Sequence, residues 1–255
     1  MLASRPPIQI PICNSAPVAY LEEPPLAFAH RGGAAEGDEN TAEAFARAIA
    51  AGYRYVETDV HATADGVPVL IHDPPDPALS YQDLLRTPPP GGPAPRLDEV
   101  LDRWPGIKFN IDVKADAAVT PTVAAIEATG AHDRVLLASF SDTRLRRLRA
   151  LTANKIATSL GQREVARLWA ASRIGAKVSM PASVVAVQVP VRHRRLRVVD
   201  RRFLALAHAL GLQVHVWTVD DPDEMAGLLD LGVDGIMTDR INILKDVFTD
   251  RGLWK

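Results

Sequence analysis

From residue 26 onward the chain alternates between short apolar runs, many of them β-branched, and longer stretches rich in Ala, Leu and Arg. The apolar runs have the length of buried strands, and the longer stretches have the length of helices. This alternation predicts repeated βα units and a parallel sheet. The expected strands are 26–31, 54–60, 68–72, 107–114, 135–140, 156–160, 184–189, 213–219 and 235–238.

Nine strands are one more than a closed barrel of eight requires. Residues 54–60 and 68–72 are joined by a turn at 64–66, which is too short for the crossover between parallel neighbours. We therefore expect this pair to form an antiparallel hairpin, with the strand at 68–72 outside the ring. The remaining eight strands predict an α/β fold, a single-domain (β/α)8 TIM barrel.

The ends of several helices carry capping residues. Asn40 is expected to cap a helix at 41–51, and Asp221 the next-to-last helix. Further helices are expected at 142–153, 162–173 and 201–210. The Pro- and Gly-rich segment 73–98 is expected to form a loop over one mouth of the barrel, with a helical turn at 80–86.

Composition limits the class of protein. The length of 255 residues is typical of one TIM barrel. The formal net charge of −2 argues against a protein whose whole surface binds nucleic acid. The single cysteine cannot form a disulfide framework, and no stretch approaches the ~20 apolar residues of a membrane span. With no signal-peptide pattern at the start, we expect a cytoplasmic protein. Residues 1–25 hold six prolines and are expected to be an extension that precedes a catalytic domain at 26–255.

Titratable residues gather where the expected strands end, and in TIM barrels the C-terminal strand ends carry the active site. They are His30, Arg31, Glu57, Asp59, His61, His72, Asp112 and Lys114. Spacing by two places Glu57 and Asp59 on one face of a strand, and the hairpin returns His72 to the level of Asp59. Each residue alone is more often an exposed or core residue than a functional one. Three carboxylates with only two or three cations, however, leave room for a divalent ion.

Eight segments of the sequence resemble the glycerophosphodiester phosphodiesterases, in the order that this family has them. They are AHRGG (29–33), ENTAEAF (39–45), ETDVHATADG (57–66), IHD (71–73), NIDVK (110–114), ASF (138–140), VWTVDD (216–221) and GVDGIMTD (232–239). The resemblance implies an acid/base pair, His30 and His72, and a phosphate contact at Arg31. Trp217 would form a wall of the substrate pocket.

The resemblance also implies a metal site at Glu57, Asp59 and Asp112. Where the family usually has Glu in an E-x-K pattern, this chain has Asp112 followed by Lys114, a side chain one methylene shorter. Ligation by carboxylates alone favours Mg²⁺ or Ca²⁺ over zinc. The ion, Arg31 and Lys114 would together stabilise the charge of a phosphodiester transition state.

The implied activity is metal-dependent hydrolysis of a small-molecule glycerophosphodiester to sn-glycerol 3-phosphate and an alcohol. Two alternatives stay open: a lysophospholipase D acting on lysophospholipids, and a binding homologue without activity. Few large apolar residues in 74–96 favour a small, water-soluble substrate, whereas the basic run at 192–202 leaves contact with a lipid surface open. Four other arginines are interpreted as an exposed helix face, and Gln188 as a candidate pocket residue. These arginines are Arg144, Arg146, Arg147 and Arg149.

Overall fold

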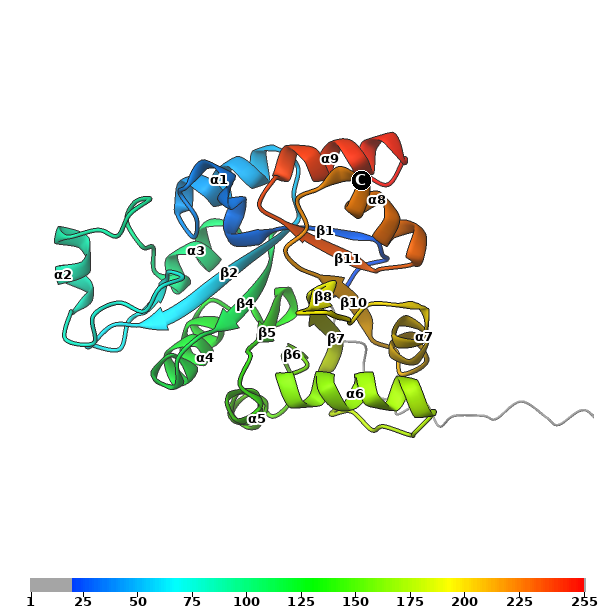
Figure 1. Ribbon diagram of the computed structural model, residues 1–255. Coiled ribbons are helices and arrows are strands. Elements are labelled where there is room, and N and C mark those ends of the chain that lie inside the picture. The colour runs from blue at the N-terminus through cyan, green and yellow to red at the C-terminus, as the bar shows by residue number, and fades with distance from the viewer. Residues whose placement is uncertain (1–19, 255) are drawn as a thin grey trace, which may run out of the picture.

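A computed structural model describes residues 20–254 and shows a closed ring of eight parallel strands surrounded by helices (Figure 1). Around the ring lie β1 (Leu26–Ala29), β2 (Tyr55–Ala62), β4 (Lys108–Val113), β5 (Val135–Ala138), β6 (Ala157–Ser159), β7 (Val184–Val189), β10 (Gln213–Val216) and β11 (Gly235–Thr238). Pairing of β1 with both β2 and β11 closes the ring. The predicted single-domain TIM barrel is confirmed.

The ninth expected strand, β3 (Pro68–Leu70), lies outside the ring and pairs with β2 in antiparallel register, Val60 opposite Leu70. The helical turn expected after it is α2 (Tyr81–Arg86). Leu84 and Ala94 pack on Val69 and hold this segment beside the barrel (Figure 1). The prediction that 73–98 covers the mouth is wrong, because Leu84 and Ala94 pack on β3 and none of these residues lines the cavity at the mouth.

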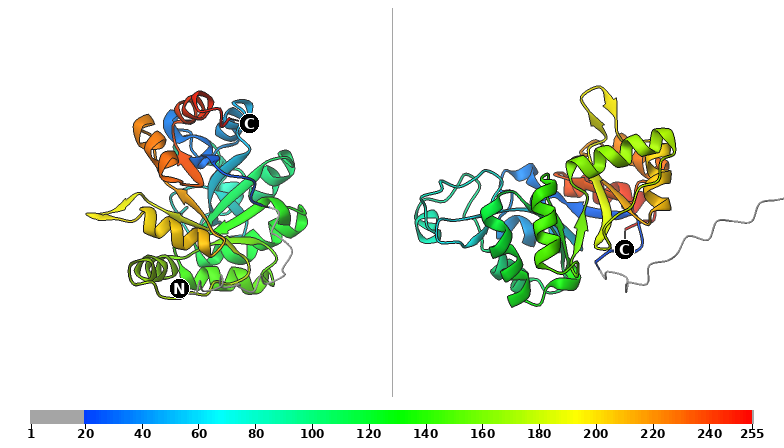
Figure 2. Two further views of the ribbon diagram at one scale, coloured as in Figure 1. Left: turned by 90° about the vertical axis from the view of Figure 1, so that its right-hand side faces the viewer. Right: turned by 90° about the horizontal axis from the view of Figure 1, so that it is seen from below.

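Helices form the outer layer around the ring, as the views in Figure 2 show. They are α1 (Ala42–Ala50), α3 (Leu97–Arg103), α4 (Val119–Ala128), α5 (Asp142–Leu151), α6 (Gln162–Ile174), α7 (Arg201–Ala209), α8 (Pro222–Leu231) and α9 (Ile241–Asp250). Short 3-10 turns are η1 (His30–Gly32), η2 (Ala34–Glu36), η3 (Asp116–Ala118) and η4 (His132–Arg134). None of the helices in the described part of the chain is long and apolar enough to cross a membrane.

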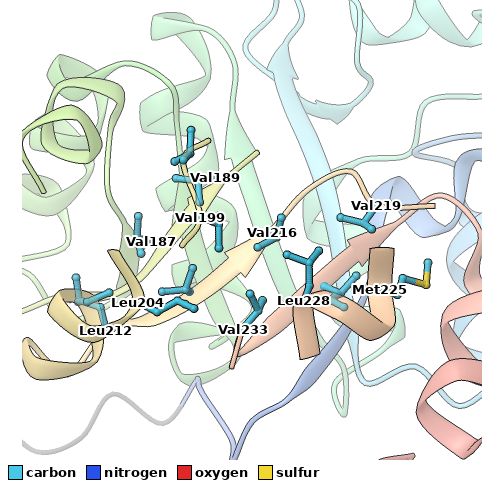
Figure 3. Packing of buried hydrophobic residues seen from close by; sticks show 14 of the residues in the cluster. Val187, Val189, Val199, Leu204, Leu212, Val216, Val219, Met225, Leu228 and Val233 are labelled. Carbon is cyan, nitrogen blue, oxygen red and sulfur yellow. The ribbon is translucent and has the colours of Figure 1, made fainter. Parts of the chain in front are cut away.

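Successive side chains of each strand point alternately outward, toward the helices, and inward, into the barrel. Outward residues such as Val187 and Val216 pack against Leu204 of α7 and Leu228 of α8 (Figure 3). Each such side chain contributes about 1.5–3 kcal/mol when it is fully buried. Inward residues near the strand starts include Tyr55 and Leu136, which pack in an apolar cluster, whereas Glu57, Asp59 and Asp112 line a cavity nearer the strand ends. Apolar side chains therefore fill the barrel at the N-terminal ends of the strands, hereafter its lower end, and polar side chains line the opposite end.

Tyr20 closes the lower end of the barrel. Its side chain is fully buried, its backbone oxygen accepts a hydrogen bond from the Tyr55 hydroxyl at 3.0 Å, and the two rings meet edge to face at 5.6 Å. Of the extension predicted at 1–25, residues 1–19 lie outside the described part of the chain.

Two local predictions are wrong. Thr41, not Asn40, caps α1: its hydroxyl accepts from the Ala44 amide at 3.2 Å, while Asn40 has a positive φ of 59° and points into the barrel. Arg149 is buried rather than exposed, because its guanidinium holds both oxygens of Glu164 at 2.7 and 3.0 Å.

Candidate active site

A cavity of about 840 Å³ opens at the C-terminal ends of the barrel strands, and all eight residues assigned a role from the sequence line it. These are His30, Arg31, Glu57, Asp59, His72, Asp112, Lys114 and Trp217. Gln188 lines it as well, and its amide donates to the Asn110 side-chain oxygen at 3.1 Å. None of residues 73–98 contributes to the described lining. The convergence expected from the strand ends is present.

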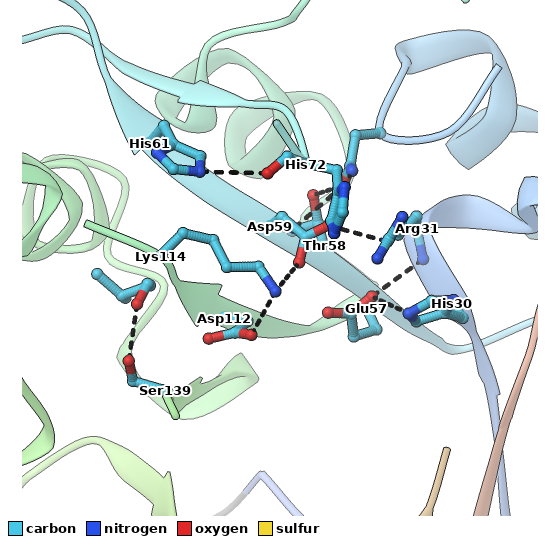
Figure 4. Close-up of polar contacts among 12 residues, drawn as sticks. His30, Arg31, Glu57, Thr58, Asp59, His61, His72, Asp112, Lys114 and Ser139 are labelled. Atoms are coloured by element: carbon cyan, nitrogen blue, oxygen red, sulfur yellow. Dashed lines mark hydrogen bonds and ion pairs between the residues drawn. The ribbon is translucent and has the colours of Figure 1, made fainter. Parts of the chain in front are cut away.

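His30 lies between two carboxylates. It follows β1, which pairs with β11, so its Nδ1 reaches Oδ1 of Asp239 at 2.6 Å, while Nε2 lies 3.7 Å from Glu57 (Figure 4). Because a carboxylate only accepts, Nδ1 carries the proton and Nε2 is directed toward the cavity. Burial alone lowers the pKa of His30, but Glu57 and Asp239 outweigh it, and the net direction is upward.

Arg31 links the first strand to two further carboxylates. Its backbone has a positive φ of 52°, and its amide donates to Oε2 of Glu57 at 3.1 Å. The guanidinium pairs with Glu39 at 2.8 Å and with Asp59 at 2.9 Å. The side chain is therefore fixed against the cavity wall, and its contact with a phosphate stays a prediction.

Asp59 is the centre of a buried polar network (Figure 4). Asn40 donates to its Oδ2 at 3.1 Å, and Lys114 reaches its Oδ1 at 2.8 Å. Lys114 also contacts Asp112 at 2.7 Å, across strands in which Asp59 and Asp112 are register partners. Burial raises the pKa of Asp59. The nearby positive charges of Lys114 and Arg31 lower it by more, so the net direction is downward.

The pKa values of the other two carboxyl groups, Glu57 and Asp112, are raised. Burial, followed by the Asp59 charge, raises the pKa of Glu57 to about 7. Burial also raises the pKa of Asp112, despite its contact with Lys114. Buried carboxylates with raised pKa values are short of compensating positive charge.

Three observations bear on whether these carboxylates fit a metal ion. Glu57, Asp59 and Asp112 line the same cavity, and their oxygens are the ligands that Mg²⁺ and Ca²⁺ prefer. Oδ1 of Asp112 is buried without a hydrogen-bond partner, as an available ligand would be. Lys114 lies between two of them, however, and no three acidic, His or Cys side chains in the described residues are grouped closely enough to hold an ion. The donor chemistry fits a hard cation, and Lys114 contacts two of the three candidate ligands.

His72 faces the cavity from the hairpin side, where the backbone amide of Ile71 donates to the Asp59 carbonyl at 3.1 Å. Nε2 of His61 donates to the His72 carbonyl at 3.2 Å and holds this stretch in place (Figure 4). His72 is 40% exposed, and its Nδ1 lies 3.1 Å from Asp73. His61 itself does not line the cavity, so its position on the strand face serves to support His72.

The opposite wall of the cavity is apolar. Trp217 follows β10, and its ring packs against Phe140 at 5.5 Å. Val165, Ala166 and Trp169 of α6 continue this surface, because Trp169 lies four residues after Val165 and three after Ala166, the spacings at which helix side chains are neighbours. Trp217 was expected in a wall of the pocket, whereas the contribution of Phe140 and α6 was not anticipated from the sequence.

Four residues that contact the candidate site residues were not assigned to the site from the sequence. Asp239, Asn40 and Glu39 orient His30, Asp59 and Arg31 respectively. Each stands in a segment that resembles the family, GVDGIMTD or ENTAEAF, which was the available signal. Asn110, two residues before Asp112 on β4, stands in the resembling segment NIDVK and shares the inward spacing of Asp112.

Known proteins resemble this chain over most of its length. The model of the glycerophosphoryl diester phosphodiesterase family matches residues 30–89 and 77–243. The protein described as probable glycerophosphodiester phosphodiesterase 2 of Mycobacterium tuberculosis is 39% identical over 244 residues, which cover 90% of this chain and 92% of that protein.

Solved structures share the fold. A glycerophosphodiester phosphodiesterase of Parabacteroides distasonis superposes with a TM-score of 0.72 at 24% identity, covering 91% of this chain and 100% of that one. An Oleispira antarctica phosphodiesterase, solved in complex with the product sn-glycerol-3-phosphate, has a TM-score of 0.70 at 19% identity and covers 89% of this chain and 97% of that one.

Proposed function

The chain belongs to the glycerophosphoryl diester phosphodiesterase family, and from this membership we propose that it hydrolyses a glycerophosphodiester to sn-glycerol 3-phosphate and an alcohol. It is an enzyme, a glycerophosphodiester phosphodiesterase. The observation that carries the proposal is the meeting of two histidines, two cations and three carboxylates in one cavity at the strand ends.

His30 and His72 are the proposed acid and base. Hydrolysis of a phosphodiester requires a water to lose a proton and the leaving alkoxide to gain one, and a pair of imidazoles serves both needs near neutral pH. Asp239 holds the Nδ1 proton of His30 and leaves Nε2 facing the cavity. His72 enters from the separate hairpin, and it is exposed enough to exchange protons with solvent.

Glu57, Asp59 and Asp112 are the proposed ligands of a divalent ion, Mg²⁺ or Ca²⁺. When bound, such an ion supplies positive charge to the phosphoryl oxygens as negative charge develops on them. Arg31 and Lys114 line the same cavity and add two fixed positive charges for an anionic substrate. The raised pKa of Glu57 and the unpartnered oxygen of Asp112 support a further positive charge at this place.

Product identity tests the proposal. Purified protein is incubated with glycerophosphoethanolamine and Mg²⁺ or Ca²⁺, and the products are followed by ³¹P NMR. We expect sn-glycerol 3-phosphate and ethanolamine. Release of glycerol and phosphoethanolamine, or no turnover with either ion, would overturn the assignment.

The apolar wall favours a second candidate substrate, a lysophospholipid. Val165, Trp169 and Phe140 offer an acyl chain a surface that a small polar head group does not need. The discriminating measurement is kcat/KM for glycerophosphoethanolamine against a lysophospholipid below its micelle concentration. The prediction from the sequence, a preference for the small substrate, fails if the lysophospholipid is clearly preferred.

A further inference from the structure

The basic run noted in the sequence forms a separate structure at the rim of the cavity. Arg192–His193 (β8) and Leu196–Arg197 (β9) make an antiparallel hairpin, hereafter the rim hairpin, which comprises residues 192–197. All six residues are exposed. In both views of Figure 2 this hairpin projects beyond the rest of the barrel.

The rim hairpin is anchored firmly at its base. Buried Val189 precedes it, and buried Val198 and Val199 follow it. The amide of Val198 donates to the Val191 carbonyl at 3.0 Å, and Nε of Arg197 donates to the Val199 carbonyl at 3.1 Å. The base of the rim hairpin is therefore fixed to the barrel by buried side chains and hydrogen bonds.

Its charge is concentrated and uncompensated. Six arginines and one aspartate fall within residues 190–202, in a chain whose formal net charge is −2. Within the described residues, the side chains of Arg192, Arg194 and Arg195 have neither an ion pair nor a hydrogen bond, whereas Arg31, Arg149 and Arg173 each have an ion pair. A cluster of free arginines on a projecting turn attracts an anionic surface.

The rim hairpin also places its arginines beside the apolar wall of the cavity. Leu196 is 45% exposed, and it and His193 line the cavity. Phe140, 48% exposed, stands at the same mouth. Arginines flanking exposed apolar side chains match a bilayer interface, where phosphates lie above hydrocarbon. Six residues are too short a stretch for the row of phosphate contacts that general nucleic-acid binding uses.

We propose that the rim hairpin docks the mouth of the barrel on an anionic lipid surface, with Arg192, Arg194 and Arg195 against lipid phosphates and Leu196 at the edge of the hydrocarbon. Docking in this orientation places the cavity over the membrane. The property can be measured without turnover, so its outcome is separate from that of the proposed hydrolysis.

The test is sedimentation of the full chain with vesicles of phosphatidylcholine, with and without phosphatidylglycerol. We expect binding only to vesicles that contain phosphatidylglycerol, and weaker binding as salt increases. Each arginine at such a surface changes the partition coefficient about fivefold, so the triple variant R192Q/R194Q/R195Q should bind about 100-fold more weakly. Leu196→Ser should also weaken vesicle binding, and the size of this loss should be the same at low and high salt.

The matched control is R103Q/R146Q/R147Q, which removes the same charge from exposed arginines on α3 and α5. It should bind like the unaltered protein. The rim variant should hydrolyse soluble glycerophosphoethanolamine normally, which checks that it is folded. Absence of binding to anionic vesicles, equal loss in the control, or equally tight binding to duplex DNA would each overturn the proposal.

Discussion

Single residues at this site are defined by their partners more than by their positions in the sequence. His30 is recognisable from its motif, but its orientation depends on Asp239, which is 209 residues away in the chain and 2.6 Å away in space. Asp59 likewise depends on Asn40 and Lys114. The residues that meet in the cavity were therefore predictable from the sequence, whereas their partners Asp239 and Asn40 were not; the chemical role of each residue stays a prediction.

At this scale the first prediction concerns the two histidines. Alanine at His30 or at His72 should lower kcat about 10²- to 10⁴-fold, the usual effect of removing a general acid or base. Both side chains line an open cavity, so neither variant should unfold. Steady-state kinetics and circular dichroism of each variant are the measurements. A His72→Ala protein that is unfolded would show instead that His72 is a structural residue.

The second residue-scale prediction concerns Asp112. Replacement by Glu extends the carboxylate into the cavity, where space exists, and restores the residue usual in the family. Asp112→Glu should keep activation by the metal, whereas Asp112→Asn should require far more metal for half-maximal activity. Metal titrations of both variants give the answer, and equal behaviour of the two would exclude Asp112 as a ligand.

At the scale of elements, the short connection between β1 and α1 shows how a helix start can serve the site. Asn40 and Thr41 are both residue types that cap helices, so the sequence does not decide between them. In the structure Thr41 caps α1, and Asn40 is left to bond both Asp59 and Thr58 inside the barrel. Tertiary hydrogen bonds to the barrel, which no local pattern shows, determine the choice.

Because Asn40 contacts Asp59 and Thr41 caps α1, we expect substitutions at these adjacent positions to have different effects. Asn40→Ala should lower activity and raise the metal concentration for half-maximal activity, about 10- to 100-fold, as loss of a residue that orients a ligand does. Thr41→Ala should instead lower the free energy of unfolding by about 1 kcal/mol and leave both kinetic quantities unchanged. Metal titration and urea unfolding of the two variants separate the roles. An unchanged metal requirement in Asn40→Ala would make Asn40 merely structural.

Other elements show where the sequence pattern was informative. Every strand of the ring was located, because apolar and β-branched residues recur along each strand, including β2 and β4, where polar residues alternate with them. Helices α3, α4 and α9 were not located. Pro121 lies in α4, and α9 is rich in residues that favour strands; packing of Leu244 and Phe248 outweighs that preference. The rim hairpin was missed because its exposed arginines give no apolar run.

For the whole molecule, the polar interior of the barrel makes stability depend on pH. His215 is fully buried, its Nε2 donates to Gln213 at 3.0 Å, and its Nδ1 faces the amide of Gln188 at 3.4 Å. This arrangement suits the neutral imidazole, and burial lowers its pKa from 6.5 to about 3. The folded barrel therefore excludes a proton that the unfolded chain binds below pH 6.5.

The sign of the effect follows from proton uptake. Above pH 6.5 His215 is neutral in both states and contributes nothing to the pH dependence; between pH 6.5 and about 3 the unfolded state is favoured by up to about 1.4 kcal/mol per pH unit. Unfolding free energies of the unaltered protein and His215→Gln, measured from pH 7 to about 4.5, should differ in slope by that amount. Equal slopes, or an NMR titration of His215 near its ordinary pKa, would contradict the account.

The central claim is that a divalent ion held by the carboxylates at the mouth of the barrel drives phosphodiester hydrolysis. Its most direct test is sn-glycerol 3-phosphate release from glycerophosphoethanolamine by exhaustively chelated protein, before and after Mg²⁺ or Ca²⁺ is added, with Glu57→Gln beside it. We predict that chelation abolishes product release, that one of the two ions restores it, and that Glu57→Gln is restored poorly or not at all. Full activity of the chelated protein would contradict the claim.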